Sequence, residues 1–225
     1  MSKKAVLLSI RPKWCKKILD GEKTVEVRRT CPKLETPFRV YVYCTNARPR
    51  FALADVFRGN WCAEVAEISG YSKDDAERTF DIFNGRIIGE FTCKKITGLT
   101  HVGETGNWEP ASLYVMAPGS YYKPADELLE AACMSKETAE KYLKGRDGLA
   151  WHISDMKIYD KPRELDEFSR FGFCGMNGTG VCGNEGCKYY EPSSNYMEPP
   201  TCKIDGCFIC RPPQSWCYVE ELSNE

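Results

Sequence analysis

The chain has 225 residues, of which 42% are hydrophobic and 28% are charged, proportions that are ordinary for a soluble globular protein. This length supports one well-buried core and leaves room for a second, small module. The longest apolar run near the N-terminus, residues 5–8, is too short for a signal peptide or a membrane span. We therefore expect a cytoplasmic protein without a membrane segment, in a compartment where thiols stay reduced.

The net charge of -1 conceals an uneven distribution along the chain. Residues 1–50 carry 13 Lys and Arg against 4 Asp and Glu, and the remainder carries 18 against 28. A basic segment of this kind is what a phosphate-contacting surface needs. It is equally compatible with a solvated face that the acidic remainder neutralises, so charge alone leaves both interpretations open.

The predicted elements begin with a strand, a helix and a second strand. Residues 6–10 are mostly apolar and predict a strand, and Pro12 suits the first turn of a helix because its missing N–H is not needed there. Apolar side chains follow at helical spacing up to Gly21, which ends the helix. Residues 24–29 then alternate as a strand.

The middle of the chain predicts one more strand and an insertion. In residues 39–45, alternation places Tyr41 and Tyr43 on one face of a strand. Residues 46–84 interrupt the rhythm of strands and contain a short predicted helix at 72–80. We interpret this stretch as an insertion rather than a domain.

The second half predicts a longer strand at residues 86–96, in which Gly89 marks a bulge or a close backbone approach. Two helices follow at residues 124–134 and 135–144, and a strand at residues 149–158. The order of elements does not repeat as strand–helix–strand units. It is closer to a small mixed barrel with helices packed on its outside.

Residues 21–28 carry the clearest functional signal. Two valines occupy alternate positions, so Glu26 and Arg28 project together from the other face of the strand, with Lys23 beside its start. An acidic and a basic side chain on a rigid strand form a small polar surface that suits a nucleobase or a sugar. The alternative is that Glu26 and Arg28 only pair with neighbouring charges across the sheet.

These residues resemble an ASCH domain, a family similar in fold to the PUA domains that bind RNA. The family hallmark G-x-K-x-x-E-x-R is matched by Gly21, Lys23, Glu26 and Arg28. The resemblance covers roughly residues 5–165, and residues 212–219 supply a final strand. It implies an α+β fold, a PUA-like mixed β-barrel flanked by helices.

The resemblance also implies a cleft whose floor carries the motif residues and whose ligand is a nucleic acid or a modified nucleoside. Arg28 can bind a phosphate bidentately, and Glu26 can accept from the exocyclic amine of a base. Aromatic side chains on the neighbouring strand can stack on an unpaired base. The predicted nucleic-acid-binding residues are Lys23, Glu26, Arg28, Arg29, Tyr41 and Tyr43.

An enzymatic alternative comes from one branch of the family, small bacterial amidohydrolases that remove the acetyl group from N4-acetylcytidine. Their lysine corresponds to Lys23, but their nucleophilic threonine stands three residues later, where this chain has Glu26. Thr24 directly follows the lysine, so its hydroxyl does not occupy the position of that nucleophile. A carboxylate does not readily replace an activated hydroxyl. The alternative is therefore an amidohydrolase for N4-acylated cytidine nucleosides, with Lys23 and Glu26 in acid–base roles.

Seven of the 13 cysteines follow residue 173. Residues 182–187 and 202–207 both read C-x-x-x-G-C, and a further cysteine adds C-x-x-C to the second stretch. The layout predicts a structural zinc site, with an iron–sulfur cluster as the lesser alternative and redox disulfides or free thiols as others. Four of five candidates would be the ligands: Cys182, Cys187, Cys202, Cys207 and Cys210.

The sequence thus predicts an ASCH-type domain at residues 1–168 with an insertion at about 46–84, a cysteine-rich segment at 169–211, and a closing strand and tail at 212–225. The expected function is binding of RNA or another nucleic acid, in a regulatory role that reads an unpaired or modified base. A protein-interaction module that uses the zinc segment is the remaining alternative, and the sequence names no protein partner.

Overall fold

A computed structural model describes residues 3–47, 84–102, 112–117, 121–171, 190–193, 195–197, 200–202, 208–209 and 211–222. In chain order its elements are β1 (Lys4–Ile10), α1 (Pro12–Leu19), β2 (Val25–Arg28), β3 (Phe38–Cys44), β4 (Ile87–Val102), β5 (Ser112–Ala117), β6 (Tyr121–Pro124), α5 (Asp126–Ala131), α6 (Lys136–Leu143), β7 (Gly148–Arg163), the 3-10 helix η1 (Leu165–Glu167), β8 (Tyr190–Glu191), β9 (Thr201–Cys202) and β10 (Trp216–Glu220).

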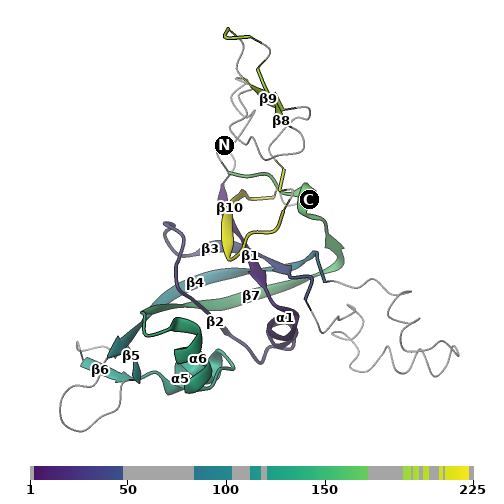
Figure 1. Ribbon diagram of the computed structural model, residues 1–225. Coiled ribbons are helices and arrows are strands. Elements are labelled where there is room, and N and C mark those ends of the chain that lie inside the picture. The colour runs from purple at the N-terminus through teal and green to yellow at the C-terminus, as the bar shows by residue number, and fades with distance from the viewer. Residues whose placement is uncertain are drawn as a thin grey trace, which may run out of the picture.

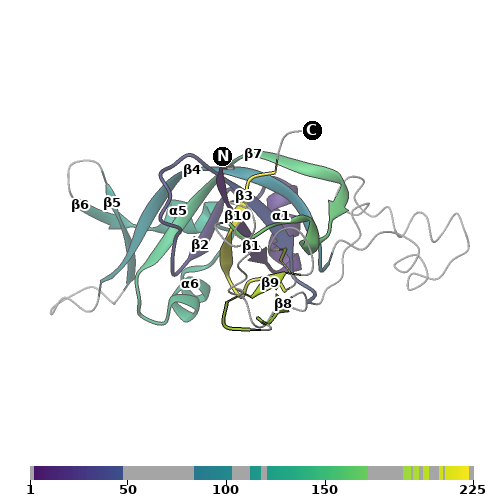
Figure 2. The same ribbon diagram turned by 90° about the horizontal axis from the view of Figure 1, so that it is seen from above.

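Eight of the strands form one mixed sheet. Its order is β10-β1-β3-β4-β5-β6, and β7 pairs with both β4 and β2. The β1–β3 pair is parallel and the β1–β10 pair is antiparallel. The long strands β4 and β7 run side by side through the molecule (Figures 1 and 2). The sheet with its few helices confirms the β-rich α+β class.

The first helix begins and ends where the sequence predicted. Pro12 occupies its first turn, and Cys15 and Ile18 are buried. Gly21 follows the helix with a φ of 76°, a left-handed conformation that glycine adopts without steric cost. The chain therefore reverses at once, and the Lys23 N–H donates back to the Lys17 carbonyl at 2.9 Å. This turn delivers the chain to β2.

Three clusters of buried side chains surround the sheet. The first lies between α1 and the sheet and includes Trp151. In the second, Val25 and Val27 of β2 pack with residues of α5 and α6. The third joins the C-terminal part of the chain to β1 and β3, with Tyr41 and Phe168 at its centre. Figure 1 shows α1 beside β1, and α5 and α6 near β5 and β6.

Most of the predicted elements are present within the described residues. The expected final strand is β10, which lies beside β1 in the main sheet, whereas β5 and β6 were not predicted. The insertion at 46–84, with its helix at 72–80, lies almost wholly outside the described residues. The division into residues 1–168, 169–211 and 212–225 stays a prediction. No helix among the described elements is long and apolar enough to cross a membrane.

A substitution at Gly89 in β4 tests how closely the backbones of β4 and β7 approach each other. A Cβ at this position would lie 2.4 Å from the Lys157 carbonyl oxygen, and the register with β7 shifts here. We expect Gly89→Ala to lower the free energy of unfolding by about 1–3 kcal/mol, because the backbone of β7 must move to make room for the methyl group. Gly98→Ala in the same strand is the control, because a Cβ there meets nothing within 4 Å. Urea denaturation measures both, and equal stabilities would contradict the close approach.

Candidate functional site

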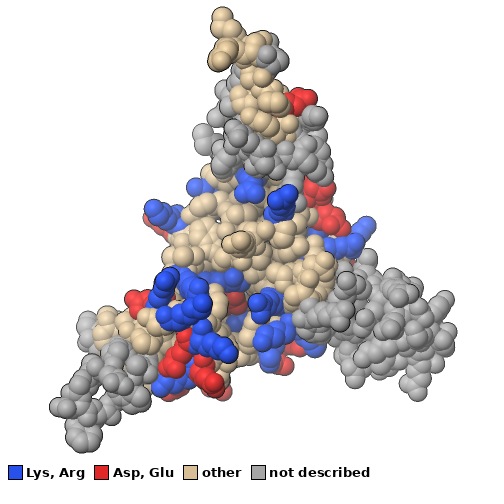
Figure 3. Space-filling view, viewed as in Figure 1, with Lys and Arg blue, Asp and Glu red and all other residues tan. Residues whose placement is uncertain are grey.

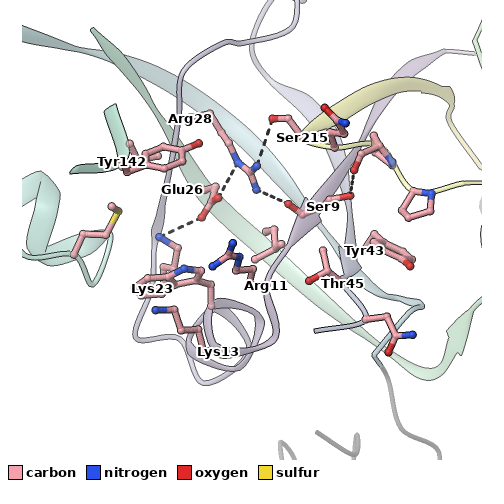
Figure 4. A pocket seen from close by; sticks show the side chains of 18 of the residues that line it. Ser9, Arg11, Lys13, Lys23, Glu26, Arg28, Tyr43, Thr45, Tyr142 and Ser215 are labelled. Carbon is pink, nitrogen blue, oxygen red and sulfur yellow. Dashed lines mark hydrogen bonds and ion pairs between the residues drawn. The ribbon is translucent and has the colours of Figure 1, made fainter. Parts of the chain in front are cut away.

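A cavity of about 730 Å³ opens between α1, β2, α6 and the segment that precedes β10. In Figure 4, Tyr142 lies on one side of it, Tyr43 and Thr45 lie on the other, and Arg28 and Ser215 lie between them. We call the buried motif residues the floor of the cavity: Lys23, Glu26 and Arg28. We call the exposed cations that line it the mouth: Arg11 and Lys13.

Glu26 lies at the centre of the floor, between two cations. One carboxylate oxygen is 3.2 Å from the Lys23 Nζ, and the other is 2.9 Å from the Arg28 Nε. The three side chains are at most 11% exposed. Because a buried carboxylate is costly unless it is paired, these contacts hold Glu26 in one place.

Lys23 is turned into the protein. Besides Glu26, its ammonium donates to the carbonyls of Val25 at 2.7 Å and Ala132 at 2.8 Å. Ala132 follows the last residue of α5, so the positive charge lies at the negative end of that helix. An ammonium has three donors, and these three partners account for all of them. Lys23 therefore positions Glu26, and its charge is used within the protein.

Arg28 connects the floor to β1 and to the segment that precedes β10. One terminal nitrogen donates to the Ser9 carbonyl at 2.6 Å, and the other donates to the Ser215 Oγ at 3.4 Å. The Ser9 hydroxyl in turn donates to the Pro213 carbonyl at 2.6 Å. The segment before β10 is thereby fixed as one wall of the cavity.

The mouth carries two cations that have no ion pair in the part of the chain that the structure describes. Arg11 precedes the first residue of α1 and Lys13 lies in its first turn. The Lys13 ammonium lies 4.4 Å from the centre of the Trp14 ring, which also lines the cavity. Figure 3 shows Lys and Arg gathering on this face over the region of β2 and α1.

The two tyrosines predicted for stacking have different surroundings. Tyr43 lines the cavity, and burial raises the pKa of its hydroxyl above the ordinary value. Tyr41 is fully buried. Its ring centre is 4.8 Å from that of Phe168, and its hydroxyl accepts from the Leu222 N–H at 2.8 Å. Tyr41 therefore belongs to the core, and the structure does not bring it to the cavity.

Arg29 lies outside the cavity, next to one of its walls. Its guanidinium is 5.0 Å from the centre of the Tyr142 ring and donates to the Tyr142 carbonyl. Tyr142 lines the cavity and its side chain is 36% exposed. Arg29 thus orients an aromatic wall instead of facing the hollow itself.

Sequence reasoning missed five residues that complete the site: Arg11, Lys13, Trp14, Tyr142 and Ser215. The cations at the mouth belong to the basic N-terminal segment, and Trp14 is one of the apolar side chains at helical spacing before Gly21. Nothing local distinguishes Tyr142 or Ser215, because each reaches the cavity through contacts with distant segments.

Four of the five predicted metal ligands lie outside the part of the chain that the structure describes. These are Cys182, Cys187, Cys207 and Cys210. Cys202 is in β9, opposite Tyr190 of β8. Within the described ranges, no group of three or more His, Cys, Asp or Glu side chains could hold a metal ion.

No family model matches the chain, and neither does any curated protein. Solved structures of an ASCH protein from Zymomonas mobilis are similar to it. The unmodified protein has a TM-score of 0.42 and 18% identity over 72% of this chain and 75% of that chain. A Tyr-to-Phe variant has a TM-score of 0.40 and 17% identity, over 73% and 78%.

A Ser-to-Ala variant of the same protein has a TM-score of 0.44 and 15% identity over 96% of this chain and 89% of that chain. All three structures are of one ASCH protein, the family that the sequence resembles. Identities and TM-scores at this level concern the fold alone and carry no information about a ligand or an activity.

Lys23→Met tests whether the floor depends on its buried ammonium. The substitution leaves Glu26 with one cation and two carbonyls without a donor. We expect the free energy of unfolding to fall by about 3–5 kcal/mol in chemical denaturation. Lys17→Met is the control, because it breaks a contact of Lys17 with Glu22 on the exposed surface, where ion pairs contribute little. Equal effects of the two substitutions would contradict a stabilising role for the floor.

Proposed function

We propose that this chain binds RNA or another nucleic acid, and that the cavity holds one unpaired base. The observation that supports the proposal most strongly is the combination of a buried ionic floor with exposed cations at the mouth that form no ion pair with any described residue. The floor offers fixed polar groups in a low-dielectric setting. The mouth offers positive charge where a sugar–phosphate backbone would pass.

The size and walls of the cavity favour a ligand of this kind. At about 730 Å³, it lies within the usual range of about 300–1,000 Å³ for small-molecule pockets. Trp14 and Tyr142 contribute aromatic surface to it, whereas Tyr43 lines it but is almost fully buried. Stacking of a base on an aromatic side chain contributes about 1–3 kcal/mol. Specificity would then come from polar groups at the floor.

An unpaired base fits the proposal better than a duplex does. The floor is almost inaccessible to solvent, and its side chains are recessed behind exposed ones. Bases in a helix present only their edges in the grooves, whereas a base in a loop or single strand can turn into a cavity. The ligand is therefore a single strand, a loop or an end.

The amidohydrolase alternative has less support. The Lys23 side-chain nitrogen already contacts three protein groups, so it is not free to take a proton from an attacking nucleophile. Thr24 has an exposed side chain and is not among the described residues that line the cavity. Incubation with N4-acetylcytidine and chromatography of the products tests this alternative, since a binding protein leaves the nucleoside intact.

Salt dependence tests the nucleic-acid proposal. We expect affinity for a fluorescent single-stranded RNA, measured by anisotropy, to fall steeply as salt rises. In the double variant Arg11→Ala/Lys13→Ala, the slope of log affinity against log salt should decrease by about 1.4, the value for two lost phosphate contacts on a single strand.

The matched control is Lys157→Ala/Lys161→Ala, which removes two exposed positive charges that do not line the cavity. This variant should keep nearly the whole slope. Binding that is indifferent to salt, or an equal loss in both double variants, would count against phosphate contacts at the mouth.

The zinc site stays a prediction with its own test. We propose that the cysteine-rich segment binds zinc, since paired cysteines at close spacing in a reducing compartment are typical of structural zinc sites. Elemental analysis of purified protein should find about one zinc per chain. Iron with visible absorbance would favour a cluster, and the lack of both metals would contradict a metal site. A protein partner that is lost on deletion of residues 170–211 would favour the interaction-module alternative.

A further inference from the structure

We propose that the cavity selects bases that carry an exocyclic amino group, and that it holds them with the amino edge at the floor and the phosphate at the mouth. The inference rests on the proposed function and adds the chemical class of the ligand and its orientation. It follows from how the hydrogen-bonding groups of the floor are already used.

The floor presents an acceptor to a ligand. Glu26 is the one acidic side chain among the described residues that line the cavity. A carboxylate has about four lone-pair sites, and the contacts with Lys23 and Arg28 use one on each oxygen. Both oxygens therefore keep capacity to accept, and an ionised carboxylate has no hydrogen to donate.

The cations of the floor use most of their donors on protein groups. Lys23 uses its three donors on Glu26 and two carbonyls. Arg28 uses three of its five N–H donors on Glu26, Ser9 and Ser215, one from each nitrogen. These two side chains fix the carboxylate in place and leave it as the group that discriminates between ligands.

The mouth has the opposite character. Arg11 and Lys13 are exposed and have no ion pair among the described residues. Figure 4 shows both on the α1 side of the hollow, and shows Glu26 between Lys23 and Arg28. A ligand that satisfies both regions has hydrogen-bond donors at one end and negative charge at the other. A nucleotide whose base carries an amino group fits this description.

The same geometry disfavours bases that present a carbonyl instead. Uracil has a carbonyl where cytosine has its amino group, and hypoxanthine has one where adenine has its amino group. A carbonyl oxygen directed at Glu26 would place two acceptors together, and the carbonyl would find no donor on that side chain. An unsatisfied buried polar group costs roughly 1–3 kcal/mol, which corresponds to a loss of about tenfold or more in affinity.

Two pairs of nucleotides test the selection on the whole, unmodified chain. Isothermal titration calorimetry with AMP against IMP, and with CMP against UMP, compares ligands of nearly equal size and equal charge. We expect AMP and CMP to bind at least about tenfold more tightly than their oxo counterparts. Equal affinities within both pairs, or tighter binding of the oxo members, would overturn the inference.

Glu26→Gln assigns the selection to the carboxylate. An amide can turn either a donor or an acceptor toward the base, so the ratio of affinities within each pair should fall toward one. A retained tenfold ratio would overturn the role of Glu26. If the variant does not fold by circular dichroism, the comparison with the unmodified chain still decides the selection.

Oligonucleotides separate this inference from the proposed function. Salt-dependent binding of oligo(A), oligo(C) and oligo(U) with equal affinity would support nucleic-acid binding and overturn the selection. Selection among mononucleotides without binding of any oligonucleotide would support the selection and overturn nucleic-acid binding. Binding of neither class of ligand would overturn both.

Discussion

The site depends on one carboxylate that is held between two cations. Glu26 is buried between Lys23 and Arg28, at contact distances of 3.2 and 2.9 Å. Through these cations it is linked to the end of α5, to Ser9 in β1 and to Ser215 before β10. These contacts join four separate parts of the chain around one point. An unpaired buried charge is strongly destabilising, so loss of either cation would weaken this junction.

This arrangement gives the proposed site its preorganisation. The side chains of the floor are fixed by protein contacts before any ligand enters, so little side-chain freedom is lost on binding. Charge that is available to a ligand lies at the exposed mouth, on Arg11 and Lys13. The proposed mode of binding assigns discrimination and affinity to different residues, which is the usual division between base contacts and phosphate contacts.

Sequence reasoning captured the local part of the site and misjudged its surroundings. Alternation predicted that Glu26 and Arg28 share a face, as observed, but all four residues of β2 are buried because α5 and α6 cover one face and the network fills the other. Tyr41 and Tyr43 share a face of β3 as well. Segments from the C-terminal part cover Tyr41, whereas Tyr43 reaches the cavity.

The sequence by itself determined the helix from Pro12 to the turn at Gly21, the strand that follows, and the spacing of the motif. These features depend on local backbone preferences and on period-2 patterning. The tertiary structure alone decided that the hydroxyl oxygen of Ser215, 187 positions from Arg28, accepts a hydrogen bond from the floor network, and that Tyr142 forms a wall. Such contacts arise from packing between distant segments, which no local pattern of residues encodes.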